Sequence, residues 1–526
     1  MDDIVGSNNP KHFVEQRRQS IILDYLIATS THGLRSVGRA YSKFNRIFWV
    51  CSFTITCGIM FYFVISNLLQ YFSYPTQTKV EIRLDRHMPF PAVTVCSGNP
   101  YRSDHLNQSL VSFYHRLTSS NATYNETVLS SLLIPLIVDL FNRNQTDEFI
   151  SIGFRLTDIL LSCDYNGIDC SNAFTASISP ALASISPALG ICYTFNWKAS
   201  GTVFTVSDYG DGIFVREGLT LSFYMPQELF YPTTWYDNGL LITLHDNDEF
   251  PVPTETGIYL RPGTSNLITY QKSETTFLPY PYSNCTTSVS DDLRGLYTST
   301  FIDPAASVDA VYSESLCIEL CQQSYIYSQC SCIFPIPFFT RKIFTNENIL
   351  ISANGCNILI GQLACALRAR QQLSSDDYLQ SQWCSRCVPQ CKHVDFQAVV
   401  SAQNAPSEGD KKYWQSLIST PLANISVLLP NNITQNFDYY FNRNYLKVQV
   451  SCSNKYTVEY NQEAKLSIVD TFSAIGGQTG LWIGLSVLSV IELCELIYRL
   501  SRHCLAERKN KTKSSIQPMT NATVDK

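Results

Sequence analysis

Residues 470–499 read DTFSAIGGQTGLWIGLSVLSVIELCELIYR, and this stretch decides how the rest of the chain is organised. The 21 residues from Thr471 to Ile491 carry no charge, which is long enough for a helix to cross the hydrocarbon core of a membrane. Its glycines, serines and glutamine suit a neighbouring helix or a water-filled path better than lipid. A helix-packing face in a receptor is one interpretation, and a pore-lining helix, with Glu492 and Glu495 concentrating cations at its end, is the one we favour.

A second charge-free stretch, from Ile47 to Phe72, predicts another membrane helix near the other end of the chain. Residues 1–46 lack the pattern of a signal peptide, so we expect export to depend on this helix. Residues 1–46 and 492–526 each hold seven Lys or Arg against four Asp or Glu, whereas the middle has a net charge of −12. The positive-inside rule therefore predicts that both termini are cytoplasmic and that the middle is extracellular.

These observations predict five segments. A cytoplasmic N-terminal region spans residues 1–46, the first membrane helix 47–74, a cysteine-rich extracellular domain 75–470, the second membrane helix 471–498 and a cytoplasmic tail 499–526. Alternating apolar residues predict strands at 91–96, 218–225 and 240–246, and apolar spacing predicts a helix at 125–143. The Ser/Ala-rich residues 171–188 are expected to form a surface loop. The fold class is therefore an α+β membrane protein.

The predicted exterior holds fifteen of the 19 cysteines. Close cysteine spacings in its second half would suit zinc in a cytosolic protein, but an oxidising compartment favours disulfides. The odd number leaves one thiol without a partner. Seven Asn-x-Ser/Thr sites in the same region predict N-glycosylation; they are Asn107, Asn121, Asn125, Asn144, Asn284, Asn424 and Asn432.

Several motifs, taken in order, make the chain resemble the degenerin/epithelial sodium channel family. They are His32-Gly33, FPAVTVCSGNP at 90–100, GICYTFN at 190–196, LHDNDEFP at 244–251, LPYPYSNC at 278–285, the cysteine-rich YSESLCIELC and CVPQC segments, and GGQTGLWIGLSVLSVIEL before the C-terminal tail. The resemblance implies a homotrimeric sodium channel of the plasma membrane, blocked by amiloride, with two membrane helices and a hand-shaped ectodomain in each subunit. It would contact lipid and sodium ions, and it would be neither an enzyme nor a nucleic-acid-binding protein.

The resemblance also implies roles for particular residues. Gly484, Leu485 and Ser486 match the family's selectivity tract, where rings of carbonyls and hydroxyls partly replace ion hydration. Other matches are assigned to the pore and its gating; these are His32, Gly33, Asp470, Ser473, Gly476, Gly477, Glu492 and Glu495. Seven disulfides are implied: Cys96–Cys192, Cys163–Cys170, Cys285–Cys391, Cys317–Cys387, Cys321–Cys384, Cys330–Cys365 and Cys332–Cys356. Cys452 has no partner in this scheme, and no cofactor or metal is implied.

The opening stimulus is less well determined by the sequence. Residues Tyr74 to Lys79 lack the paired histidines of acid-sensing relatives, and the C-terminal tail lacks the proline-rich motif of epithelial subunits. We therefore expect an RFamide-type neuropeptide to open the channel, because a cationic, aromatic peptide suits an acidic exterior. Acid, bile acids or constitutive opening are the alternatives, and the run Asp246, Asp248, Glu249 is either a proton-sensing cluster or a solvated turn. A two-pass scavenger-type receptor is the alternative outside the channels.

Overall fold

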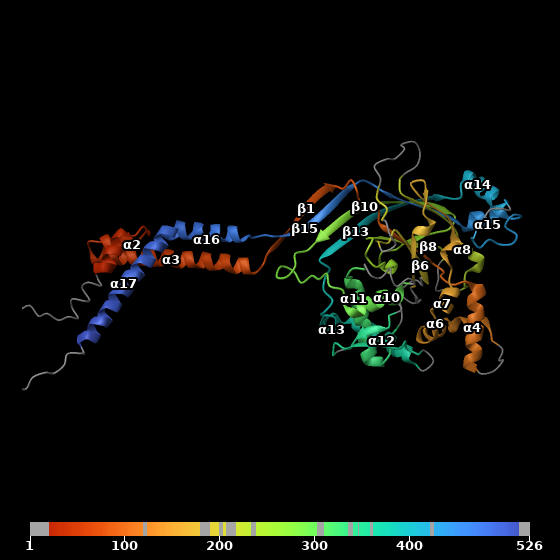
Figure 1. The fold of residues 1–526 in the computed structure, drawn as a ribbon, viewed down its shortest axis with the longest axis horizontal. Helices are drawn as coiled ribbons and strands as arrows, with labels where there is room; N and C mark the ends of the chain where they lie inside the picture. Colours follow the sequence, from red (N-terminus) through yellow and green to blue (C-terminus); the bar gives the residue numbers. More distant parts are fainter. Residues whose placement is uncertain are drawn as a thin grey trace, which may run out of the picture. The chain divides into compact units, whose positions relative to one another are not determined.

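The computed structural model describes residues 20–118, 124–178, 190–198, 203–206, 217–232, 238–301, 310–334, 340–345, 347–357, 361–420 and 426–514. The chain divides into two compact units, one made of residues 1–77 with 464–526 and the other of residues 78–463. The first unit is helical and the second is a mixture of strands and helices (Figure 1).

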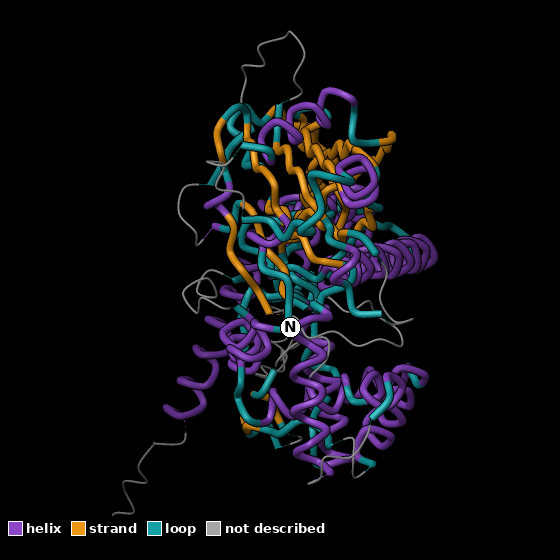
Figure 2. The backbone as a smooth tube through the Cα atoms, turned by 90° about the vertical axis from the view of Figure 1, so that its right-hand side faces the viewer, coloured by secondary structure: helices purple, strands orange, loops and turns teal. Residues whose placement is uncertain are grey.

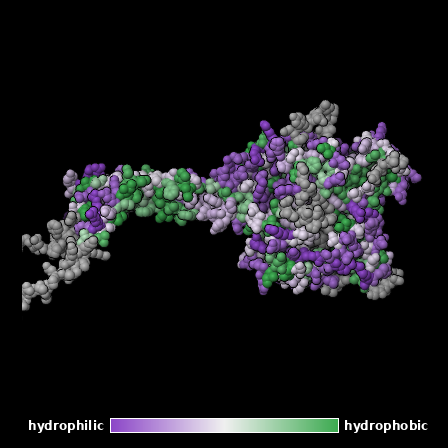
Figure 3. Space-filling view, viewed as in Figure 1, coloured by the Kyte–Doolittle hydropathy of each residue, from purple (hydrophilic) through white to green (hydrophobic). Residues whose placement is uncertain are grey.

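The first unit is built on α3 (Lys43–Phe72), which packs along α16 (Ile468–Ile483). The rings of Phe63 and Trp482 stack with centroids 6.2 Å apart at this contact. Hydrophobic side chains cover both helices (Figure 3). By length and composition, α3 is the one helix of the described residues that could cross a membrane unaided. A short helix, α2 (Leu34–Arg39), packs against α3.

The stretch expected to form one helix at 471–498 forms two. α16 ends at Ile483, α17 (Val487–Ser514) follows after three residues, and the two are bent by 71°. The pair is long and apolar enough to cross a membrane only when it is counted as one broken span. The break has a local cause, because Gly484 adopts φ 64°, a left-handed conformation that ends a helix and favours glycine.

The second unit contains two large sheets, and Figure 2 shows their strands close to one another. In the described residues, the eight-stranded sheet has the order β1-β15-β10-β14-β7-β3-β4, with β13 paired to β10. The five-stranded sheet has the order β5-β6-β2-β8-β9. The strands of the first sheet are β1 (Thr76–Leu84), β15 (Tyr456–Ala464), β10 (Thr264–Thr276), β14 (Tyr445–Cys452), β7 (Leu219–Tyr224), β3 (Leu160–Tyr165), β4 (Ile168–Asp169) and β13 (Lys392–Asn404). Those of the second are β5 (Phe174–Ile178), β6 (Ile191–Phe195), β2 (Ala92–Ser97), β8 (Leu240–His245) and β9 (Ile258–Leu260).

The main core of this unit lies where the two sheets meet, with Val95, Leu221, Ile242 and Val448 among its buried residues. The strands predicted around 91–96, 218–225 and 240–246 are β2, β7 and β8, and nearly all their residues are buried. The expected loop at 171–188 is a strand over Phe174–Ile178, since this segment pairs with β6, and residues 179–189 lie outside the described part.

Two groups of helices lie beside the sheets. The first is α4 (Ser103–Thr118), α5 (Glu126–Ser131), α6 (Leu133–Asn142), α7 (Thr146–Ser151) and α8 (Leu156–Ile159), so that the helix expected at 125–143 is interrupted at Leu132. The second is α10 (Asp291–Thr300), α11 (Glu314–Cys330), α12 (Gln362–Ser375) and α13 (Asp377–Trp383), with the two-stranded sheet of β11 (Lys342–Phe344) and β12 (Leu350–Ser352). Shorter helices are α9 (Pro253–Thr256), α14 (Glu408–Ile418) and α15 (Phe437–Asn444).

Seven disulfides lie in the second unit, and they join the same cysteines that the family resemblance implies. Two of them tie α11 to the segment around α13, through Cys317–Cys387 and Cys321–Cys384. A third joins Cys330, at the end of α11, to Cys365 on α12. Cross-links between residues this far apart in the chain stabilise by restricting the unfolded state, typically by about 2–4 kcal/mol each.

Candidate functional site: the helix break and the carboxylates after β8

The break between α16 and α17 is held by hydrogen bonds that replace part of the helical pattern. The backbone N–H of Leu485 donates to the carbonyl of Thr479 at 3.1 Å, six residues back, which closes the end of α16 around the left-handed Gly484. Beyond the break, the Ser486 hydroxyl accepts from the backbone N–H of Ser489 at 3.3 Å, which caps the start of α17. These hydrogen bonds therefore give the break a defined local geometry.

Residues 29–33 pack directly onto this break. The backbone N–H of His32 donates to the carbonyl of Ile483 at 2.9 Å. A Cβ atom added to Gly484 would lie 1.8 Å from Nδ1 of His32, a distance that no side chain can accept. Gly33 has φ 84°, and a Cβ there would lie 2.9 Å from the ring of Phe53. Both glycines are therefore required by close packing, and the structure brings the His-Gly pair and the predicted selectivity tract together.

The two glutamates that follow the break have different environments. Glu492 accepts hydrogen bonds from the Thr29 hydroxyl at 3.0 Å and from the backbone N–H of Ser30 at 3.0 Å. The Ser30 hydroxyl also lies 2.7 Å from the hydroxyl of Ser489. Glu495 instead forms an ion pair with Arg499 one helical turn later, at 2.5 Å. Glu492 is thus part of the packed break, whereas Glu495 is neutralised by its neighbour on the helix surface.

The remaining residues assigned to the pore lie on α16, outside the packed break. Asp470 accepts hydrogen bonds from the backbone N–H and the hydroxyl of Ser467, which completes a capping box at the start of α16. Ser473 is exposed. A Cβ atom at Gly476 or Gly477 would meet nothing within 4 Å. This face of α16 is therefore open in a single chain.

A second group of candidate residues lies in the second unit, at the end of β8. Asp248 forms an ion pair with Lys198 at 3.2 Å. Glu249 lines a cavity of about 530 Å³ that is also lined by Glu255 and Glu314. Burial, and then the charge of Asp246, raise the pKa of Glu249 to about 7. Burial and the charge of Asp248 likewise raise the pKa of Asp246. Glu249 can therefore change charge near neutral pH.

His245, which precedes these carboxylates, does not share this property. It is 7% exposed, its Nε2 lies 2.8 Å from the Thr94 hydroxyl, and its Nδ1 lies 2.9 Å from the carbonyl of Asp246. Burial lowers the pKa of His245 to about 4, so the ring is neutral at physiological pH. The histidine is part of the core, and the titratable groups of this cluster are the carboxylates.

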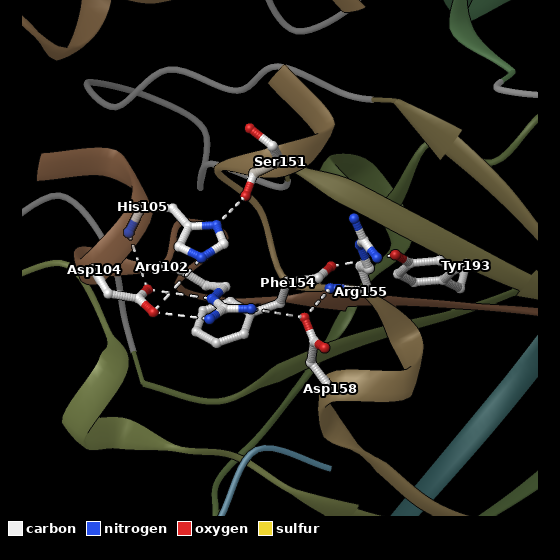
Figure 4. A network of polar contacts seen from close by, with 8 residues as sticks. All are labelled: Arg102, Asp104, His105, Ser151, Phe154, Arg155, Asp158 and Tyr193. Carbon is white, nitrogen blue, oxygen red and sulfur yellow. Dashed lines mark hydrogen bonds and ion pairs between the residues drawn. The ribbon is translucent and has the colours of Figure 1, made fainter. Parts of the chain in front are cut away.

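A third polar cluster surrounds Arg102 at the start of α4 (Figure 4). The guanidinium lies 2.8 Å from Asp104 and 3.4 Å from Asp158, and Asp158 accepts the backbone N–H of Arg155 at 3.0 Å. Burial alone would raise the pKa of Asp104, but the hydrogen bond and charge of Arg102 lower it. His105 joins the cluster through its backbone N–H, which donates to Asp104 at 3.0 Å, while its Nδ1 lies 2.7 Å from the carbonyl of Ser151. Sequence reasoning missed this cluster, since no local pattern connects Arg102 with Asp158.

The remaining predicted sites are surface positions. Five of the predicted glycosylation sites are exposed: Asn107, Asn125, Asn144, Asn284 and Asn432. Asn121 and Asn424 lie outside the described residues. In the part of the chain that the structure describes, no group of three or more His, Cys, Asp or Glu side chains is arranged to hold a metal ion.

Comparison with known proteins gives one consistent result. The family described as amiloride-sensitive sodium channel matches residues 25–496. The chain is 24% identical to the human bile acid-sensitive ion channel, over 90% of this chain and 85% of the relative. It is 24% identical to the zebrafish (Danio rerio) acid-sensing ion channel 1C, over 93% and 85%. It is 23% identical to the epithelial sodium channel subunit alpha of Neoceratodus forsteri, over 90% and 78%.

Proposed function

The chain belongs to the amiloride-sensitive sodium channel family, and from this premise we propose that residues 484–486 form the selective part of a sodium pore. The observation that carries the proposal is the helix break, where Gly484 ends α16 and Ser486 caps α17. At a break of this kind, backbone carbonyls lose their helical hydrogen-bond partners. These carbonyls and the nearby serine hydroxyls become available to other ligands. Such groups can replace part of the hydration shell of an ion.

The pore requires several copies of the chain, since the two candidate spans of one chain cannot enclose a water-filled path. We propose a homotrimer in the plasma membrane, with both termini cytoplasmic and amiloride acting as a pore blocker. The open glycine face of α16, around Gly476 and Gly477, supports this assembly, because small residues let neighbouring helices approach closely. The packed His32-Gly33 segment would then support the pore from the side of the N-terminus.

Substitution of Ser486 tests the pore assignment. Ser486→Val removes the hydroxyl and adds bulk, so the Na⁺/K⁺ permeability ratio under voltage clamp should fall by at least about fivefold, equivalent to about 1 kcal/mol of lost discrimination. Ser501→Val, at an exposed position on α17, is the matched control and should leave the ratio unchanged. An unchanged ratio in Ser486→Val, with normal surface expression, would remove residues 484–486 as the selectivity tract.

For the opening stimulus, we propose an extracellular amidated peptide of the RFamide type. The cavity next to Glu249 supports this proposal, since it combines the carboxylates of Glu255 and Glu314 with the rings of Phe250 and Phe277. The positive charge of such a peptide is opposite to that of the carboxylates, and its aromatic side chains can pack against the phenylalanine rings. Opening requires that the peptide bind the open state more tightly than the closed state.

Acid is a second candidate stimulus, and one specific observation favours it. The pKa of Glu249 is raised to about 7, so a modest fall in pH neutralises this carboxylate. Oocytes that express the chain separate the candidates when peptides, pH steps and bile acids are each applied with and without amiloride. Amiloride-sensitive current with micromolar peptide at constant pH supports the first proposal. Large currents on acidification, lost in Glu249→Gln and without any peptide response, would replace it with the second.

A further inference from the structure

A cavity of about 350 Å³ lies where the two groups of helices beside the sheets meet. One wall comes from α6 and α7 of the first group, and the other comes from α10 and from Arg341, which precedes β11. Much of the lining is apolar and includes Leu140, Phe149 and Phe301, and the two charged residues that line it are Asp147 and Arg341. A mainly apolar cavity of this size with few charged groups is typical of a site for a small organic molecule.

Arg341 supplies the positive charge of this cavity. Its guanidinium lies over the ring of Phe141, 4.2 Å from the ring centroid, and one of its N–H groups donates to the carbonyl of the same residue. The backbone carbonyl of Arg341 accepts the N–H of Ala353 at 2.9 Å. In the part of the chain that the structure describes, no carboxylate forms an ion pair with this guanidinium. A guanidinium has five N–H donors, so several remain for a ligand.

The environment of Arg341 favours a monoanion as the ligand. The residue is half-buried, and burial lowers the pKa of its guanidinium because the charge is partly removed from water. A carboxylate would supply a counter-ion, and its two oxygens match the planar fork of N–H donors. A dianion such as phosphate is disfavoured, because one cation neutralises only half of its charge while the Asp147 carboxylate lines the same cavity.

Contacts next to the cavity hold its two walls together. Oδ1 of Asn142 accepts the backbone N–H of Gly355 at 2.7 Å, and Nδ2 of Asn142 donates to the carbonyl of Gly355 at 3.3 Å. Phe141 also packs in a small core with Ile333 and Ile343. The cavity is therefore formed by contacts within the chain, so a ligand can bind with little reorganisation.

We propose that this cavity binds a small organic monocarboxylate with an apolar body, whose carboxylate pairs with Arg341 and whose body packs against Phe149 and Phe301. The ligand contacts both groups of helices, so it favours the conformations in which the two groups keep this separation. An amidated peptide ends without a carboxylate, so this ligand differs from the proposed opening peptide, and its cavity differs from the one next to Glu249. The inference holds whichever stimulus opens the channel.

The test measures binding of 1-naphthylacetate to the full chain in detergent by isothermal titration calorimetry. Every sample carries Asn144→Gln, because Asn144 lines the cavity and is a predicted glycosylation site. This parent should bind one 1-naphthylacetate per chain. The neutral amide 1-naphthylacetamide has nearly the same shape and should bind about tenfold more weakly, since it lacks the charge that pairs with Arg341.

Substitutions of the two charged lining residues locate the site. Arg341→Gln should remove the preference for the acid over the amide, whereas Arg341→Lys, which keeps the charge but loses the planar fork, should retain part of it. Asp147→Asn removes a negative charge from the cavity and should strengthen binding of the acid by about two- to threefold. Arg368→Gln, at an exposed position on α12, is the matched control and should leave both affinities unchanged.

Two results would overturn the proposal. If the parent binds the acid no better than the amide, or binds neither, the Arg341 guanidinium recognises no carboxylate ligand in this cavity. If Arg341→Gln keeps the full preference for the acid, the acid binds at another place on the chain. The melting temperature of each variant must match that of the parent, which separates a lost contact with the ligand from lost folding.

Discussion

The carboxylates around Arg102 and those at the end of β8 are the same kinds of residue in opposite electrostatic environments. Asp104 and Asp158 share one guanidinium, and the pKa of Asp104 is lowered despite its burial. Asp246 and Glu249 face each other, and the pKa of each is raised. The difference shows what a cation in contact with the carboxylates does. With a cation, the carboxylates form ion pairs that connect parts of the fold. Without one, their pKa values rise and they can take up protons.

The largest expected effect comes from removing the shared cation. Arg102→Leu should lower the free energy of unfolding by about 3 kcal/mol at pH 7, because the buried Asp158 and the more exposed Asp104 both lose their partner. The measurement is thermal unfolding of the detergent-purified chain, with Arg102→Lys as the control that keeps the charge and should lose less. The deficit should shrink as the pH falls and the carboxylates are neutralised. Equal losses in Leu and Lys variants would mean that packing, and not charge, holds this cluster.

The next effect concerns Glu249, whose ordinary pKa of 4.5 is raised to about 7 in the folded chain. Between these values the folded chain binds more protons than the unfolded chain, so the free energy of unfolding falls as the pH rises, by about 3 kcal/mol in total. Glu249→Gln should remove this decline, which is measured by denaturant unfolding at a series of pH values. Asp104→Asn should act in the opposite sense, because the lowered pKa of Asp104 contributes stability that is lost at acid pH. A slope unchanged by Glu249→Gln would place the titrating group elsewhere.

The smallest effect is expected from Lys198, which contacts the β8 cluster through Asp248. The side chain of Lys198 is 52% exposed and its ion pair is screened by solvent. Lys198→Ala should therefore change stability by less than about 1 kcal/mol. It should also move the midpoint of the Glu249-dependent transition to slightly higher pH, since a positive charge near the cluster is removed. A change as large as that of Arg102→Leu would show that the two clusters differ less than their contacts suggest.

Features with a local signal were predictable from the sequence. The strands at 92–97, 219–224 and 240–245 followed from their apolar runs and turn signals, and the cysteine pairs followed from the family resemblance. The helix break at Gly484 was not predicted, because a charge-free run predicts one continuous helix. The left-handed conformation of a glycine does not change the hydropathy of the segment.

Polar contacts between distant residues had no such signal. Arg102 is 56 residues from Asp158, and Thr29 is 463 residues from Glu492. Nothing in the composition around either pair indicates that the partners meet. The strand at 174–178 was missed for another reason, since its Ser/Ala-rich sequence resembles a loop and only its pairing with β6 makes it a strand.

The contact between His32 and Gly484 has a consequence for how this chain can evolve. The imidazole occupies the space that a side chain at position 484 would need. A descendant can therefore acquire a side chain at 484 only if position 32 has already become smaller, and the reverse order of changes passes through an unfit intermediate. Lineages with a side chain at 484 should therefore carry a smaller residue at 32, whereas lineages that have replaced only His32 can keep Gly484.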